Sequence, residues 1–146
     1  MDSKEFKNIF GDVAKEHNFK KAFSGWYKEN PECLSILELQ KSNFGNYYQL
    51  NIKIFIQGVF EKTYLPTKDL IKSSKGHVNS SETNDYKNVF DFDESTDDNL
   101  RIEQLKELFR NHIIPFTNKA SSKAGIKELA DKGDIFLLPA IKEELA

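Results

Sequence analysis

The residues best suited to chemistry lie in an acidic run, DFDESTDD, at positions 91–98. Asp91 and Asp93 are two positions apart and follow the apolar pair Val89 and Phe90. Two aspartates spaced in this way after an apolar strand can serve phosphoryl transfer. One carboxylate attacks phosphorus, the other acts as acid and base, and both hold Mg²⁺. The spacing therefore raises phosphoryl transfer as a hypothesis.

This motif resembles the nucleophile motif of haloacid-dehalogenase-like phosphatases, but its context does not fit. Such enzymes set the aspartate pair in a doubly wound parallel sheet, and little of the chain after Thr96 could supply the remaining strands. Glu94 and Ser95 stand where that motif usually has glycine and threonine. A short motif without its context is weak evidence, so we do not expect a phosphatase.

A calcium loop is a second hypothesis for the acidic run. Such loops draw oxygen ligands from alternate positions, and the run offers Asp91, Asp93, Ser95 and Asp97. However, Thr96 replaces the glycine of the sharp turn, and Ile102 replaces the final bidentate glutamate.

Helix capping explains the end of the acidic run more simply. A helix is predicted to begin near Asp98, and acids at a helix start accept from free backbone N–H groups and complement the positive end of the dipole. Asp97 and Asp98 then need no metal, and we expect neither a metal nor a cofactor here.

Cysteine and histidine do not form a catalytic set. A single cysteine, Cys33, excludes an internal disulfide, and its place at the start of an apolar strand predicts a small buried hydrophobe. His17, His77 and His112 have no partner at a metal-ligand spacing. The sequence therefore favours a non-enzymatic protein, with an enzyme as the open alternative.

Aromatic and polar residues on or beside neighbouring predicted strands form a second candidate site. Trp26 and Tyr48 are the rings we expect at the surface, and Gln40, Lys41 and Ser42 would supply polar contacts nearby. Two interpretations stay open: most of the rings form the core, or several share an outer face and anchor a partner. The pI of about 5.9 argues against a nucleic acid as the partner.

An α+β domain is expected to position these residues. Apolar residues at helical spacing predict an N-terminal helix, capped at Asp2 and ended at Asn18. Aromatic, aliphatic and alternating segments then predict three strands joined by short turns, which favours an antiparallel meander. The strands are expected at about 19–28, 33–40 and 50–56, with a possible fourth at 86–92 and an open assignment for 62–87.

Helical spacing returns after residue 98. Pro115 is expected to bend or end that helix. A further helix is predicted at 122–132, closed by Gly133, and a last one opening at Asp134. We therefore expect an N-terminal helix, an antiparallel sheet of three to four strands and C-terminal helices packed on one face.

Length and charge bound the organisation. The chain has 146 residues and a net charge of −2, which fits a single domain over residues 1–146. Residues 1–90 carry 13 basic and 11 acidic residues, a net +2, and residues 91–146 carry 8 and 12, a net −4. No apolar run approaches the roughly 20 residues that span a bilayer. Without such a run, and with no signal-peptide pattern at the start, we expect a cytoplasmic protein with no membrane contact.

Three segments carry a family resemblance: FKKAFSGWYKEN, LELQKSNFGNYYQLNIKIFI and a late helix with IIPF. Together they resemble a family of small bacterial proteins known as domain of unknown function 4304. The resemblance extends over roughly residues 6–130, and it implies an α+β fold and no established activity.

We therefore expect a non-enzymatic protein-binding module, in the form of an immunity-type protein that neutralises a bacterial toxin. Asp91, Asp93, Asp97 and Asp98 would steer the protein onto a basic partner such as a nuclease domain. The alternative is a small-ligand-binding protein or enzyme with a pocket between sheet and helices. Its conceivable contacts are Gln40, Ser42, Tyr48 and His112.

Overall fold

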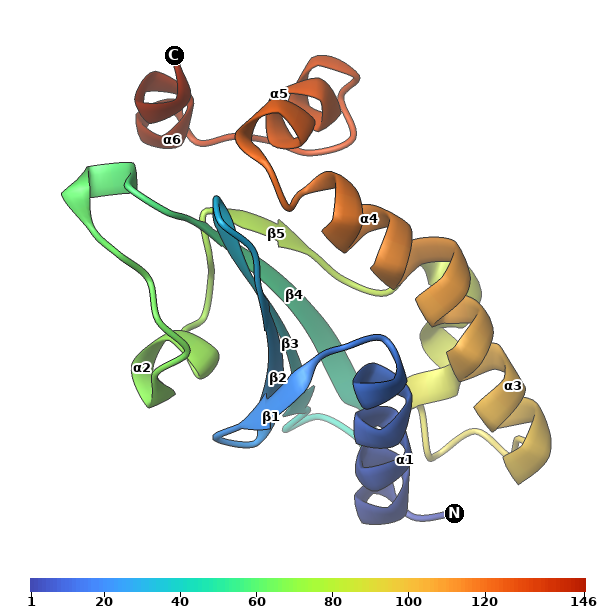
Figure 1. The fold of residues 1–146 in the computed structure, drawn as a ribbon. Coiled ribbons are helices and arrows are strands. Elements are labelled where there is room, and N and C mark those ends of the chain that lie inside the picture. Colours follow the sequence, from blue (N-terminus) through green and yellow to red (C-terminus); the bar gives the residue numbers. More distant parts are fainter.

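An antiparallel sheet forms the centre of the fold, as Figure 1 shows for a computed structural model that describes residues 1–146. Its five strands lie side by side in chain order, so the sheet is a simple meander. They are β1 (Lys20–Ala22), β2 (Gly25–Glu29), β3 (Cys33–Lys41), β4 (Tyr48–Ile56) and β5 (Val78–Ser80). The α+β class is confirmed, and the prediction of three to four strands is wrong.

One of the uncounted strands comes from the segment predicted as a single strand at 19–28. That segment is a hairpin, β1 and β2, which turns at Phe23 and Ser24. Both turn residues have left-handed backbones, with φ of 48° and 67°. Such turns usually use glycine, asparagine or aspartate, so neither residue marks a turn in the sequence.

The possible strand at 86–92 is also wrong. Residues Asn84–Phe90 form a 3₁₀ helix, η2, and only Asp91 pairs with the sheet, through an isolated bridge to Tyr47. The buried guanidinium of Arg101 donates to the carbonyl oxygens of Asn88, Val89 and Asp91 at 2.7–3.0 Å. Those carbonyls are therefore not available to a neighbouring strand. The short β5 pairs with β4 instead.

One face of the sheet is covered by α1 (Ser3–Glu16), α3 (Asp98–Leu108) and α4 (Ile114–Lys119) (Figure 1). Their apolar side chains, with those of the sheet, form the main core. Phe6, Phe10 and Phe109 are completely buried in it. The cap at Asp2 is confirmed, since its carboxylate accepts from the backbone N–H of Glu5 at 2.8 Å. Packing on this face places the start of α1 next to the sheet.

The opposite face carries a smaller core beneath residues 57–77. This segment contains the 3₁₀ helix η1 (Val59–Glu61) and the short helix α2 (Lys68–Ile71). Five buried residues form the smaller core: Leu34, Ile36, Phe55, Tyr64 and Ile71. Helical structure therefore lies on both faces of the sheet.

The helix containing Pro115 does not end there. A π-helical turn at Phe109–Ile113 joins α3 to α4 in one continuous rod that reaches Lys119. Proline removes one backbone donor and crowds the preceding turn. The π turn changes the local hydrogen-bonding pattern just before the proline, so the rod continues past it.

Helices α5 (Lys123–Asp131) and α6 (Pro139–Leu145) cap the end of the molecule far from the N-terminus (Figure 1). The predicted helix at 122–132 is confirmed, with Ser122 as its cap and Gly133 left-handed after it. The predicted helix start at Asp134 is wrong, because α6 begins at Pro139, and proline suits the first helical position. None of the helices is long and apolar enough to cross a membrane.

Candidate functional site

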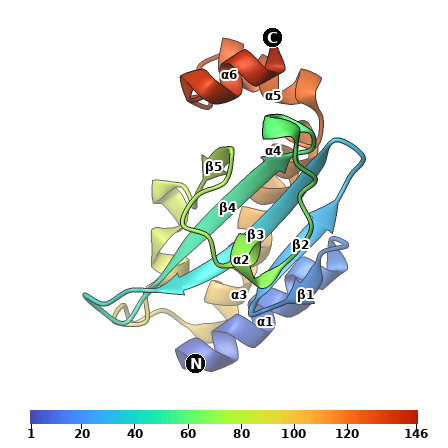
Figure 2. The ribbon, with the colours of Figure 1, turned by 90° about the vertical axis from the view of Figure 1, so that its left-hand side faces the viewer.

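Three segments that are distant in the sequence meet at one end of the molecule, near the N-terminus (Figure 2). They are the start of α1, the β3–β4 turn at residues 42–47 and the acidic run at 91–98. We term them together the hairpin-end surface. The backbone N–H of Asn46 donates to Asp93 Oδ2 at 3.1 Å, and the backbone N–H of Phe92 donates to the carbonyl of Asn46 at 2.8 Å. These bonds fasten the acidic run to the turn.

The start of α1 is joined to the same surface by side chains. Lys41 Nζ donates to Ser3 Oγ at 3.1 Å, and the Tyr48 hydroxyl donates to the Ser3 carbonyl at 3.2 Å. The N-terminal ammonium lies 3.3 Å from Asp98 Oδ1. The structure therefore brings together seven of the predicted site residues: Lys41, Ser42, Tyr48, Asp91, Asp93, Asp97 and Asp98.

Three carboxylates of the acidic run, those of Asp91, Asp93 and Asp97, accept backbone N–H groups. Asp97 Oδ2 accepts from the N–H of Leu100 at 3.2 Å and caps α3, as helix capping predicts. Asp91 Oδ1 accepts from the N–H of Asp93 at 3.0 Å. No group of three or more His, Cys, Asp or Glu side chains is placed to hold a metal ion, and the sheet beside the run is antiparallel. The geometry gives no support to the phosphatase or calcium hypotheses.

Arg101 fixes the backbone of the acidic run by hydrogen bonds. Its side chain is only 3% exposed, and besides the carbonyls of Asn88, Val89 and Asp91 it donates to the carbonyl of Glu94 at 3.3 Å. The guanidinium also lies over the ring of Phe92, 4.8 Å from the ring centroid. The run therefore has a fixed backbone, although Asp93, Glu94 and Asp97 are exposed to solvent.

Phe44 is the most exposed large hydrophobic residue of the protein. It lies in the β3–β4 turn and is 95% exposed. Its backbone N–H donates to Ser42 Oγ at 3.0 Å, and Ser42 N–H donates to the Tyr47 carbonyl at 2.9 Å. The ring is thus presented on an ordered turn. The sequence signal for this exposed ring is its position among turn residues, because a ring in such a turn does not reach the core.

Two predictions about exposure are wrong. Trp26 is 3% exposed and Tyr48 is 8% exposed, because their strand positions face α1 and α3 and not solvent. Trp26 packs on Phe10 at a centroid distance of 4.9 Å, away from the hairpin-end surface. Gln40 is exposed on the other face of the sheet, where its Oε1 accepts from Asn51 Nδ2 at 3.1 Å. Neither Trp26 nor Gln40 belongs to the hairpin-end surface.

The predicted pocket contacts do not meet. Five hollows of the surface have linings without Gln40, Ser42 and Tyr48. His112 Nε2 lies 2.8 Å from the carbonyl oxygen of Ser81, which accepts its N–H. The prediction that these four residues share a pocket is therefore wrong.

Cys33 has no nucleophilic role in this fold. The thiol is completely buried, as its place in an apolar strand predicts. Burial, and then the negative charge of Glu32, raise the pKa of the Cys33 thiol to about 12. The reactive thiolate is therefore scarce at neutral pH.

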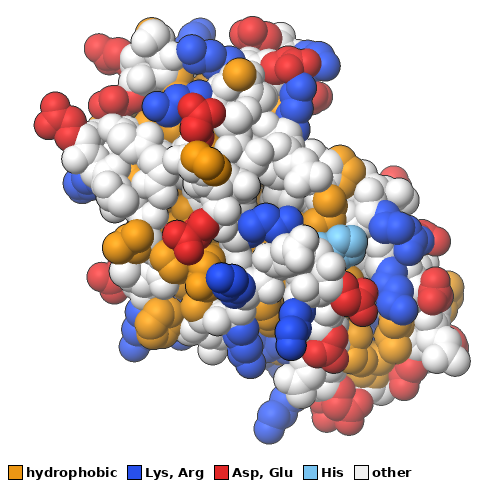
Figure 3. Space-filling view, in the orientation of Figure 1, with side chains coloured by type: hydrophobic (Ala, Val, Ile, Leu, Met, Phe, Trp, Pro, Cys, Tyr) orange, Lys and Arg blue, Asp and Glu red, His pale blue; other side chains and the backbone are white.

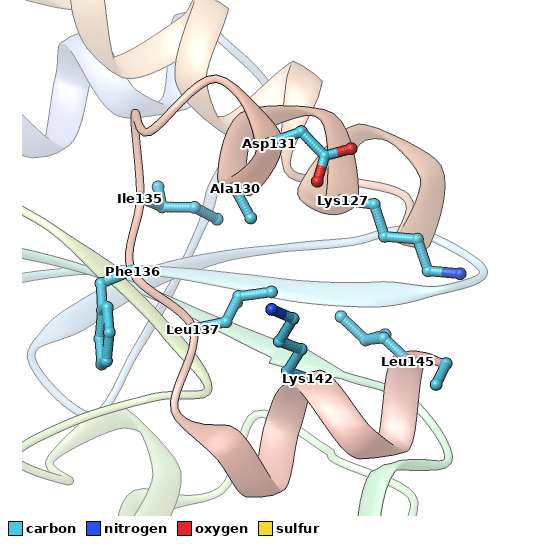
Figure 4. Close-up of a pocket in the computed structure, with 9 residues that line it drawn as sticks. Lys127, Ala130, Asp131, Ile135, Phe136, Leu137, Lys142 and Leu145 are labelled. Atoms are coloured by element: carbon cyan, nitrogen blue, oxygen red, sulfur yellow. The ribbon is translucent and has the colours of Figure 1, made fainter.

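An apolar hollow that the sequence did not reveal lies between α5 and α6 (Figure 4). Its volume is about 410 Å³. Ile135, Leu137 and Leu145 line it, with Lys127 and Lys142 beside them. Phe136 points away from this group in Figure 4 and is 79% exposed. The only sequence signal is the apolar run IFLLPAI at 135–141.

The model of one protein family matches residues 10–119, and its description is domain of unknown function (DUF4304). The chain therefore belongs to this family, and the sequence resemblance is confirmed. The match contains the sheet and ends before α5. No curated protein and no solved structure matches the chain.

Proposed function

We propose that this protein is a non-enzymatic protein-binding module whose contact surface is the hairpin-end surface. The observation that carries the proposal is the 95% exposure of Phe44 on a turn fixed by hydrogen bonds. Large aromatic rings that enter a partner's pocket are frequent hot spots of protein interfaces. A preorganised turn lowers the entropy that is lost on binding.

Charge around Phe44 indicates the chemistry of the partner. Asp93 is bonded to the turn itself, and Glu94, Asp97 and Asp98 are exposed in the same run. A partner with an apolar pocket and a basic rim would complement this arrangement, and opposite charge would speed its association. Binding of this kind needs no cofactor.

A nuclease toxin is a partner with this chemistry, because an enzyme that binds phosphates has a basic surface. We therefore propose an immunity-type role, in which the hairpin-end surface covers the basic site of a bacterial toxin. We also propose the cytoplasm as the compartment, since one buried free thiol suits a reducing environment.

The charge contribution is tested with the partner captured by the tagged protein from its host, identified, purified and measured by biolayer interferometry. The variant changes Asp91, Asp93, Asp97 and Asp98 to asparagine, which keeps an acceptor oxygen for each backbone contact. We expect association to slow by about tenfold at low salt and to lose its salt dependence. A matched control changes Asp131, Asp134, Glu143 and Glu144 to amides at the opposite end and should leave association unchanged.

The contribution of Phe44 is tested in the same assay. Phe44→Ser should raise the dissociation rate by about tenfold or more, as loss of a hot-spot ring does. Phe136→Ser is the control, because Phe136 is also strongly exposed but lies at the far end. Equal kinetics for wild type, Phe44→Ser and the four-asparagine variant would overturn the proposal.

A further inference from the structure

A second hollow lies between α1 and the edge hairpin β1–β2. Its volume of about 580 Å³ exceeds that of the apolar hollow between α5 and α6. We term it the lysine hollow, because four of its nine lining residues are lysines: Lys7, Lys15, Lys20 and Lys21. In the sequence these lysines are spread over two elements, and only the fold gathers them.

The lysine hollow carries an excess of positive charge. Asp12 is the only acidic residue of the lining, so four lysines and one aspartate give a net +3. None of the four lysines takes part in a salt bridge. Figure 3 shows blue side chains over β1, with red ones beside them over α1.

Like charges also lie close to Lys7. Its pKa is lowered, first by burial and then by the positive charges of Lys21 and Lys72. Since like charges at short range destabilise the folded state, an anion bound between them would relieve the repulsion.

Trp26 provides an independent observation in the wall of the lysine hollow. Its side chain is 97% buried, as its 3% exposure shows, and its indole N–H donates to no group of the protein. Buried tryptophan usually finds an acceptor for this N–H. The fully enclosed side-chain atoms without a partner are Ser35 Oγ and Arg101 Nε, so the indole nitrogen keeps access to the hollow.

Gly11 of α1 lies directly against this indole. A Cβ at this position would lie 3.0 Å from Trp26 Nε1 and 3.2 Å from Cζ2. Any larger residue would therefore stand over the indole N–H. Glycine in a helix interior costs roughly 1 kcal/mol relative to alanine, and here it leaves space above a free donor.

We propose that the lysine hollow binds a small phosphate-bearing anion, with the lysine ammonium groups neutralising its charge and the Trp26 N–H donating to one of its oxygens. A phosphate ester or diphosphate carries two or more negative charges, which suits a net charge of +3 better than a single carboxylate does. The volume is within the range of small-ligand pockets. This site is separate from the hairpin-end surface and does not depend on protein binding.

A concave site favours a small anion over a nucleic acid. Nucleic-acid binding proteins extend basic charge along a face that follows the phosphate backbone. Here the lysines surround a hollow, and the whole chain has a pI of about 5.9.

The experiment uses the single tryptophan of the chain, whose indole ¹⁵N–¹H signal needs no further assignment. Inorganic pyrophosphate is titrated into the ¹⁵N-labelled full chain at constant ionic strength. We expect a saturable shift of the indole signal with a Kd below about 1 mM, equivalent to about 4 kcal/mol of binding free energy. The double variant Lys7→Gln and Lys21→Gln should weaken this binding at least tenfold.

Two controls separate the site from general charge effects. Lys127→Gln with Lys142→Gln removes the same charge from the hollow between α5 and α6, and should leave the pyrophosphate affinity unchanged. The four-asparagine variant of the acidic run should also leave it unchanged, so failure here is distinct from failure of the protein-binding proposal.

Three outcomes would overturn the proposed anion site. The first is a linear shift that does not saturate. The second is an equal affinity in the Lys7→Gln, Lys21→Gln variant. The third is a response of the indole signal to an oligonucleotide with none to pyrophosphate.

Discussion

At the scale of single residues, the fold keeps His77 neutral. Its Nδ1 accepts the backbone N–H of Ile56 at 2.9 Å, and its ring meets Phe55 and Tyr64 edge-on. Burial lowers the pKa of His77 to about 4, although the charge of Glu144 opposes the shift. A protonated Nδ1 cannot accept, so protonation removes a bond that joins the segment before β5 to β4.

The free energy of unfolding should therefore depend on pH through His77. The unfolded chain takes up the proton near pH 6.5 and the folded chain only near pH 4, so the contribution is complete above pH 6.5 and is lost as the pH falls toward 4. We expect a loss of about 1–2 kcal/mol, allowing for partial exposure of the ring. Urea unfolding of wild type and His77→Asn at pH 7.5, 5.5 and 4.5 measures it. Identical pH profiles would refute this role for His77.

Lys53 is a second residue with a defined structural task. It is 1% exposed, and its Nζ donates to Glu38 at 2.9 Å, to the Ile71 carbonyl at 2.6 Å and to the Ser73 carbonyl at 2.8 Å. All three ammonium donors are used, so Lys53 fastens the end of α2 to the sheet.

Replacing Lys53 by methionine should lower the free energy of unfolding by about 3 kcal/mol, because buried acceptors lose their partner. Hydrogen exchange should also speed up at residues 68–73 before the rest of the sheet. Lys75→Met, on an exposed neighbour, is the control. A loss no larger than that of the control would show that Lys53 does not anchor α2.

At the scale of elements, the β1–β2 turn carries strain. Phe23 and Ser24 both have positive φ, which costs roughly 1–2 kcal/mol per residue for side chains of this kind. Phe23 is also 53% exposed, so burial of its ring does not offset the strain.

Changing the turn to asparagine and glycine, Phe23→Asn with Ser24→Gly, should raise the free energy of unfolding by about 1–2 kcal/mol, because these residues adopt left-handed backbones readily. Thermal unfolding followed by circular dichroism tests this. Phe44→Asn is the control, since Phe44 is exposed in a turn without a positive φ, and its stability should match wild type. A double variant no more stable than wild type would show that the turn is not strained.

Elements with strong local patterns were predictable from the sequence. The α1 stripe, its cap at Asp2 and the left-handed Asn18 agree with the structure. The alternation along β4 holds only at residues 48–51, because residues 52–56 are buried on both faces. Elements decided by tertiary contacts were not predictable. Residues 84–90 became helical where Arg101 binds the carbonyls of Asn88 and Val89, and a π turn carried the rod past Pro115.

The candidate site was predictable in its residue types and only partly in its assembly. The acidic run and Lys41 were expected, but the contacts between Ser3 and Lys41 and between Asn46 and Asp93 join positions 38 and 47 residues apart. No local pattern reports such pairings. The burial of Trp26 depends in the same way on which face of the sheet α1 covers.

At the scale of the whole molecule, the two ends differ in structure. The hairpin-end surface lies near the N-terminus, and α5 and α6 form the far end (Figure 2). The family match at residues 10–119 ends before α5, and α6 still buries Ile141 and Leu145 in the core.

Deleting residues 134–146 should leave a folded sheet of lower stability. Loss of two buried aliphatic side chains removes roughly 3–6 kcal/mol of burial, which corresponds to a melting temperature lower by roughly 5–15 °C. Circular dichroism measures the melting temperature, and partner binding should keep its wild-type affinity. A truncated chain that folds but no longer binds would show that the far end takes part in the contact.

Photocrosslinking at position 44 tests whether Phe44 enters the partner. The photoreactive analogue p-benzoylphenylalanine replaces Phe44 in the full chain in its host, and in a second strain it replaces Phe136. We predict one discrete adduct with the partner from position 44 and none from position 136. Adducts from position 136 alone, or none from position 44 while the partner is bound, would contradict it.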